Sequence, residues 1–130
     1  MAGTFKFELV SPERILMSAD ADQVVLMAAA GQMTVLPGHA PAVAALQPGV
    51  MDVSVGGKTR RVYVGGGFAE IDPEQLTVLA EKAYDVDDLK GSVLDDEIRA
   101  AETALANAVT DDARWVAGTA LESLKGLAAR

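Results

Sequence analysis

His39 is the only histidine of the chain, and its imidazole is the side chain best suited to proton transfer or metal binding near neutral pH. It lies in the segment 37–41, which reads Pro-Gly-His-Ala-Pro, so two prolines stiffen the loop that presents it. Catalysis would need a nucleophile or an orienting acid beside it, and zinc would need three or four ligands. No acidic residue occurs between Asp22 and Asp52. The pattern therefore favours a structural or interface role for this histidine.

Three consecutive glycines, Gly65, Gly66 and Gly67, invite comparison with a phosphate-binding loop. Such a loop continues as Gly-Lys-Ser/Thr into a helix, and a dinucleotide-binding fingerprint opens a helix after its third glycine. Here residues 68–71 read Phe-Ala-Glu-Ile and continue as a strand. We therefore expect these glycines to form a structural turn, either a bulge or a close backbone contact between sheets.

Composition excludes several classes of partner. The net charge of −8 disfavours nucleic acid, which proteins bind through clustered Lys and Arg, and it equally disfavours anionic lipid. The chain has no cysteine, so it has no disulfide and no thiolate metal site, and no pattern points to a metal or a cofactor. No apolar run approaches the ~20 residues of a membrane span, so we expect no direct membrane insertion.

The elements that position these residues are predicted to be short strands over residues 1–84. Phe5, Phe7 and Leu9 alternate with charged residues, which is the period of a half-buried strand. Gly56-Gly57 separates two further runs and suits a two-residue hairpin turn. Many short strands without an intervening helical period predict an antiparallel β-sandwich or barrel. The apolar runs cover residues 5–9, 15–17, 24–27, 33–36, 43–46, 50–55, 60–64, 68–71 and 75–80.

Residues 85–130 change to a helical period after an acidic linker. Ser92 and Asp95 predict a capping pair at the start of the first helix, and Thr110 is placed to cap the second. Each helix carries one apolar stripe that is narrow and rich in alanine. The interface between the two helices is therefore thin, and we expect it to hold an antiparallel hairpin only weakly. The stripe residues are Ile98, Ala101, Leu105 and Ala108 in the first helix, and Val116, Ala120, Leu124 and Leu127 in the second.

Three motifs in order resemble a known family. They read Leu-Pro-Gly-His-Ala-Pro at 36–41, Gly-Gly-Phe-Ala-Glu-Ile at 66–71 and Leu-Thr-Val-Leu-Ala at 76–80. This order is similar to that of the epsilon subunit of F-type ATP synthase, which is called delta in mitochondria. The resemblance implies a sandwich of about ten strands followed by a helical hairpin. It also implies a non-catalytic rotor subunit at the cytoplasmic face of the bacterial inner membrane, bound to the gamma subunit and the c-ring.

The resemblance also assigns candidate interface residues. Carried over by position, the turn from Gly31 to His39 would face the polar loops of the c-ring. Family members often have Glu where this chain has Gln32, so one charged contact is expected to be weakened or replaced. The residues assigned to this interface are Gly31, Gln32, Met33, Pro37, Gly38 and His39.

Some members of the family bind ATP through a motif Ile/Leu-Asp-x-x-Arg-Ala. Asp96, Arg99 and Ala100 match part of it, but Asp95 stands at the apolar position, and an extra acid beside a triphosphate is unfavourable. The motif is therefore degraded, and we expect weak or absent ATP binding. A plain alternative for Asp96 and Arg99 is a surface ion pair. Since the hairpin is acidic as a whole, we also expect only feeble inhibition of ATP hydrolysis through the alpha or beta subunits.

Two other interpretations stay open from the sequence. The first is a free-standing sandwich that serves as a binding module of another assembly. The second is an enzyme that uses Glu70, Asp72 and Glu74 with His39, which would require these four groups to converge in one pocket.

Overall fold

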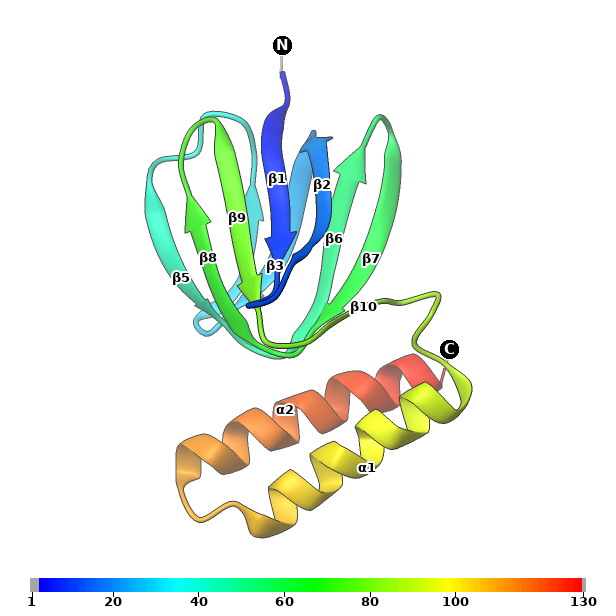
Figure 1. Cartoon of the computed structure of the whole chain (residues 1–130). Coiled ribbons are helices and arrows are strands. Elements are labelled where there is room, and N and C mark those ends of the chain that lie inside the picture. The colour runs from blue at the N-terminus through cyan, green and yellow to red at the C-terminus, as the bar shows by residue number, and fades with distance from the viewer. Residues whose placement is uncertain (1–2, 130) are drawn as a thin grey trace.

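Ten short strands and two helices make up the computed structural model, which describes residues 3–129 (Figure 1). The predicted fold class, a sandwich followed by a helical hairpin, is confirmed. The tenth strand, β10, was not among the predicted apolar runs. The strands are β1 Phe5–Val10, β2 Ile15–Ala21, β3 Gln23–Ala28, β4 Gly31–Val35, β5 Ala42–Leu46, β6 Gly49–Val55, β7 Lys58–Val64, β8 Gly67–Ile71, β9 Gln75–Ala80 and β10 Ala83–Asp85, and the helices are α1 Gly91–Asn107 and α2 Asp111–Ala128.

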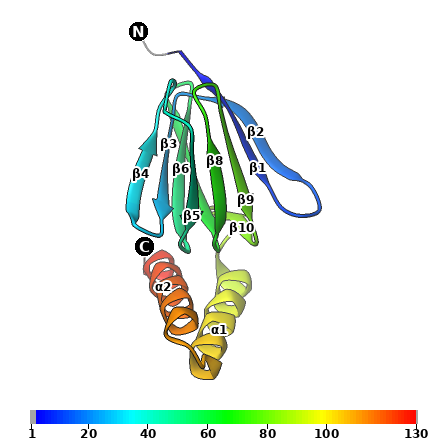
Figure 2. The ribbon, with the colours of Figure 1, turned by 90° about the vertical axis from the view of Figure 1, so that its left-hand side faces the viewer.

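The strands form two facing layers, which are seen edge-on in Figure 2. One layer has the order β10-β7-β6-β3, and the other has the order β5-β8-β9-β1-β2. A single pair, Ala28 opposite Leu46, joins them, and β4 lies on an edge where it pairs with β3. β1 and β9 run parallel, whereas the other paired strands are antiparallel.

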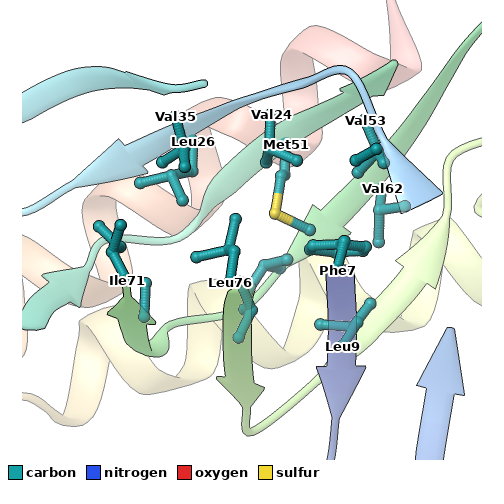
Figure 3. Close-up of a cluster of buried hydrophobic side chains, with 14 of the residues drawn as sticks. Phe7, Leu9, Val24, Leu26, Val35, Met51, Val53, Val62, Ile71 and Leu76 are labelled. Carbon is teal, nitrogen blue, oxygen red and sulfur yellow. The ribbon is translucent and has the colours of Figure 1, made fainter. Parts of the chain in front are cut away.

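The core fills the space between the two layers with aliphatic side chains around Phe7 and Met51 (Figure 3). In β1 the predicted alternation is confirmed, because Phe5, Phe7 and Leu9 are at most 3% exposed while Lys6 is exposed. The predicted hairpin turn is confirmed as well: Gly56 and Gly57 have φ of 58° and 81°, a conformation that favours glycine.

The helical hairpin packs beneath one end of the sandwich, as Figures 1 and 2 both show. The predicted cap of α2 is confirmed, since the Thr110 hydroxyl accepts a hydrogen bond from the Ala113 N–H at 3.0 Å. A second apolar cluster joins the hairpin to the sandwich, and it consists of Tyr63, Val86, Leu89, Leu94, Ala101, Leu124 and Leu127.

Two details of the helices were predicted wrongly. Helix α1 begins at Gly91 after Lys90 and has no side-chain cap, so Ser92 and Asp95 do not form a capping pair. The cause is tertiary packing, because the buried Leu94 joins the second apolar cluster and sets where the helix starts. In α2 the predicted stripe residues Ala120, Leu124 and Leu127 do pack against the second apolar cluster, but the fourth position is wrong: Ala117 is buried there while Val116 is 45% exposed.

The acidic linker is an ordered turn that closes the sandwich. The Asp85 carboxylate accepts a hydrogen bond from the Arg60 guanidinium at 2.8 Å and another from the Asp87 N–H at 3.0 Å. These bonds hold the pKa of Asp85 below its usual range. Val86 and Leu89 are buried on either side of the turn, so the linker positions the hairpin against the sandwich.

Candidate interaction surfaces

The loop that carries His39 is a β-turn anchored on a neighbouring turn. The His39 N–H donates to the Leu36 carbonyl at 3.2 Å, with proline second and glycine third in the turn, and Gly38 has φ of 84°. This is the residue pattern of a type II turn. The Gly38 N–H also donates to the Pro73 carbonyl at 2.8 Å, in the turn between β8 and β9. The loop is therefore rigid and presents its tip to solvent.

The six residues assigned to the c-ring interface lie along one edge strand. Gly31, Gln32 and Met33 begin β4, whereas Pro37, Gly38 and His39 follow its other end, beyond about 13 Å of strand at ~3.3 Å per residue. The structure therefore does not gather them into one compact patch. It places the two groups at the two ends of β4, whose outer edge has no neighbouring strand within residues 3–129.

The groups proposed for catalysis line none of the three cavities described within residues 3–129, although the bond from Gly38 to Pro73 brings the His39 loop beside the turn that holds Asp72 and Glu74. The His39 ring is half-buried, and its Nδ1–H donates to the Ala40 carbonyl at 2.7 Å. The Asp72 carboxylate accepts hydrogen bonds from the N–H groups of Glu74 and Gln75, each at 3.1 Å, and so stabilises its own turn. Within residues 3–129 no three His, Asp or Glu side chains are grouped in a way that could hold a metal ion.

The glycine run 65–67 brings two strands into close contact. A Cβ atom on Gly67, which has φ of 143°, would lie 1.9 Å from the Leu79 carbonyl oxygen of the paired strand β9. The Gly65 N–H donates to the Lys82 carbonyl at 2.8 Å. The backbone groups of this run therefore contribute to the sheet and its turns, and β8 lies close against β9.

An exposed row of apolar side chains crosses five strands of one outer face. Strand register places Ala45, Phe68, Leu79, Val10 and Ile15 opposite one another in that order on β5, β8, β9, β1 and β2. Phe68 is 56% exposed, Leu79 42% and Ile15 58%. We call these five residues the outer apolar row. Contiguous apolar surface of this kind marks an interaction site.

Sequence reasoning missed the outer apolar row. A signal was present, because Phe68 and Leu79 are large apolar residues at positions where the alternation of β8 and β9 calls for polar ones. In the next row on the same face, Glu70, Thr77, Glu8 and Ser18 are polar, whereas Val43 of β5 is apolar and 73% exposed. An apolar strip beside a polar one resembles the core and rim of an interface.

Asp96 and Arg99 form an exposed pair on the surface of α1. The Arg99 Nη1 and Asp96 Oδ1 atoms are 3.5 Å apart, and both side chains are at least 70% exposed. This is the geometry of a surface ion pair one turn apart, which contributes little to stability.

Tyr63 makes folding sensitive to alkaline pH. Burial, together with the nearby Glu97 carboxylate, raises the pKa of Tyr63 from 10.0 to about 12. Between these values the unfolded chain has lost the phenolic proton while the folded chain keeps it. The contribution of Tyr63 to the free energy of unfolding is therefore fully present below pH 10, and it is lost as pH rises toward 12, by about 3 kcal/mol at most.

Urea unfolding at pH 9 and pH 11 should show this loss of stability, and the Tyr63→Phe variant should lose less. An equal loss in both proteins would contradict the assignment.

A small sandwich with an exposed apolar row and a helical hairpin beneath one end defines a docking subunit of a larger assembly. Residues 4–86 match the family model described as ATP synthase, Delta/Epsilon chain, beta-sandwich domain. The chain belongs to this family. The predicted family is thereby confirmed, and with it the interpretation of the chain as a non-catalytic ATP synthase subunit.

Curated relatives match over most of the chain. The ATP synthase epsilon chain of Parvibaculum lavamentivorans is 44% identical over 128 residues, covering 98% of this chain and 97% of that one. The ATP synthase epsilon chain of Sinorhizobium fredii is 50% identical over 106 residues, covering 81% of this chain and 79% of that one. The match to the first relative therefore includes the helical hairpin as well as the sandwich.

Two solved structures share the fold. A chain of the Euglena gracilis mitochondrial ATP synthase, solved as an OSCP/F1/c-ring assembly, superposes with a TM-score of 0.73 at 21% identity, covering 95% of this chain and 79% of that one. A chain of the Tetrahymena thermophila mitochondrial ATP synthase central stalk and c-ring superposes with a TM-score of 0.64 at 12% identity, covering 96% of each chain. Neither helix of residues 3–129 has the length and apolar character of a membrane span.

Proposed function

We propose that the chain is a rotor subunit of the central stalk in a proton-translocating F-type ATP synthase. It couples rotation of the c-ring to ATP synthesis through the gamma subunit, and it makes or breaks no bond itself. The outer apolar row carries this proposal, since a rigid sheet face with exposed Phe68, Leu79 and Ile15 suits a protein partner rather than a substrate. In the cell the subunit would lie at the cytoplasmic face of the inner membrane, held there by the complex.

Gamma is the partner proposed for the outer apolar row. The row lies on paired strands whose backbone is fixed by the sheet, so docking orders few additional groups. Phe68 is the second of the five residues and lies between Ala45 and Leu79, whose apolar side chains are smaller. An exposed aromatic side chain within an apolar patch is a typical hot spot.

The c-ring is the partner proposed for the β4 edge and the loop after it. Gln32 is exposed at one end of this edge, and the Pro37–His39 turn lies at the other. Because the turn is fixed by its hydrogen bond to Pro73, it loses little entropy when it docks. Residues 1–84 would then supply both docking faces, and the hairpin of residues 85–130 would be the part free to act on alpha or beta subunits.

Membranes whose ATP synthase lacks its own epsilon chain provide the functional test. Adding the purified chain should restore ATP-driven proton pumping, measured by quenching of a pH-sensitive dye. Membranes treated with buffer alone give the uncoupled baseline. Continued ATP hydrolysis without pumping at saturating chain would contradict the proposed role.

ATP is expected to bind weakly or not at all to the hairpin. Asp95 and Asp96 are adjacent on α1, and Arg99, one turn along the helix, is exposed and already paired with Asp96. Like charge would repel a triphosphate at this position. Calorimetry with Mg-ATP should therefore show no saturable heat below about 1 mM, where tight sites give clear signals. A submillimolar dissociation constant would contradict this prediction.

A further inference from the structure

The contact between the hairpin and the sandwich is incomplete. The second apolar cluster fills one part of it, but a cavity of about 560 Å³ lies beside that cluster. Ala101, Ala117 and Leu124 of the hairpin line this cavity together with Tyr63 and Lys82 of the sandwich. Small side chains around a cavity that is open to solvent give little dispersion energy. Apolar packing is therefore concentrated in the second apolar cluster, where Leu94, Leu124 and Leu127 are at most 6% exposed, and polar contacts gain importance beside the cavity.

Glu97 of α1 supplies such a contact. Its Oε2 accepts a hydrogen bond from the Tyr84 hydroxyl at 2.8 Å, and its Oε1 accepts one from the Lys82 ammonium at 3.1 Å. Both donors belong to the segment that ends the sandwich, in and just before β10. Only 15% of the Glu97 side chain is exposed, so water replaces these donors poorly.

We propose that Glu97 is a latch that holds the helical hairpin against the sandwich. Each oxygen of the carboxylate accepts one bond from the sandwich, so a single side chain ties two donors to one helix face. Hydrogen bonds to charged groups are stronger than neutral ones, and a half-buried carboxylate left without partners is costly. Loss of the charge therefore shifts the equilibrium toward a hairpin that has left the sandwich.

The neighbouring tyrosines support this geometry. The hydrogen bond from Tyr84 to Glu97 raises the pKa of Tyr84, and the Glu97 charge contributes to the raised pKa of Tyr63. Asp112 and Glu81 line the same cavity and add negative charge around it. Lys82 is the cation in the lining that balances these carboxylates, and replacing it should also release the hairpin from the sandwich.

The absence of cysteine makes the test direct. Spin labels are attached to cysteines that replace Lys58, the first residue of β7 beside the Gly56-Gly57 turn, and Glu122, an exposed residue of α2. The turn between β6 and β7 lies at the end of the sandwich away from the hairpin (Figure 1), so pulsed electron resonance reports the distance between sandwich and hairpin. The full chain with Glu97 intact should give one narrow distance. Glu97→Gln should raise the population at other distances by about tenfold to a hundredfold, the change expected from losing a charge-assisted bond. Lys82→Met should act in the same direction.

The matched control is Asp96→Asn, which removes a carboxylate from the adjacent residue, where it is 70% exposed and paired with Arg99 on the same helix. This variant should keep the narrow distance. An unchanged distance distribution in both Glu97→Gln and Lys82→Met would overturn the proposal, as would equal opening in Asp96→Asn. Because the isolated chain is measured, the result does not depend on the proposed rotor role.

Discussion

Replacing Gly67 with alanine is expected to lower the free energy of unfolding by about 4 kcal/mol or more, a loss outside the range of ordinary substitutions. The added Cβ would lie 1.9 Å from the Leu79 carbonyl oxygen, and φ of 143° is a conformation that alanine rarely adopts. The colliding atom is backbone, so β8 and β9 would have to separate. Since small domains are stable by only about 5–15 kcal/mol, the variant should be largely unfolded or unfold at low urea. Circular dichroism during urea titration measures this.

Gly118→Ala is the matched control. An added Cβ at this α2 position meets nothing within 4 Å, so alanine should stabilise the helix by about 1 kcal/mol. If Gly67→Ala unfolded at the same urea concentration as the unchanged chain, the close contact between β8 and β9 would not be essential to the sandwich.

Replacing Phe68 with aspartate is expected to weaken gamma binding by at least about a hundredfold while the chain stays folded. Phe68 is 56% exposed, so the substitution changes little in the core. In the complex, however, a charge would be buried without a partner in an apolar interface, and the aromatic anchor would be lost. Titration of gamma by calorimetry gives the ratio of dissociation constants.

Leu36→Asp is the control for Phe68→Asp, since it places the same charge at an apolar residue that is 49% exposed in the loop after β4. It should leave gamma binding within about threefold of the unchanged chain, because a solvated charge outside an interface contributes little. Equal loss in both variants would show that the outer apolar row is not the gamma surface.

Much of the fold could be predicted because local signals agreed with one another. The alternation of β1, the Gly56-Gly57 turn and the Thr110 cap each depend on a few neighbouring residues, and the structure confirms all three. The start of α1 could not be read this way. Ser92 is a good capping residue, yet burial of Leu94 against the sandwich moved the helix start to Gly91. Tertiary packing outweighed a local preference worth about 1 kcal/mol.

The interaction surfaces depended on long-range register, which one sequence does not display. The residues of the outer apolar row come from five strands and meet only because β1 pairs with β9 in parallel. The Glu97 latch likewise joins residues 13 and 15 positions apart across two structural units. By contrast, the motif around His39 could be recognised directly, because its turn is formed by adjacent residues.

The most direct test of the central claim is sedimentation of the purified chain with the gamma subunit from the same organism at micromolar concentrations. The proposed role predicts a single one-to-one complex that survives dilution to about 1 μM, the range of specific protein interfaces. Two independently sedimenting species at these concentrations would contradict the claim that the chain turns with gamma as one body.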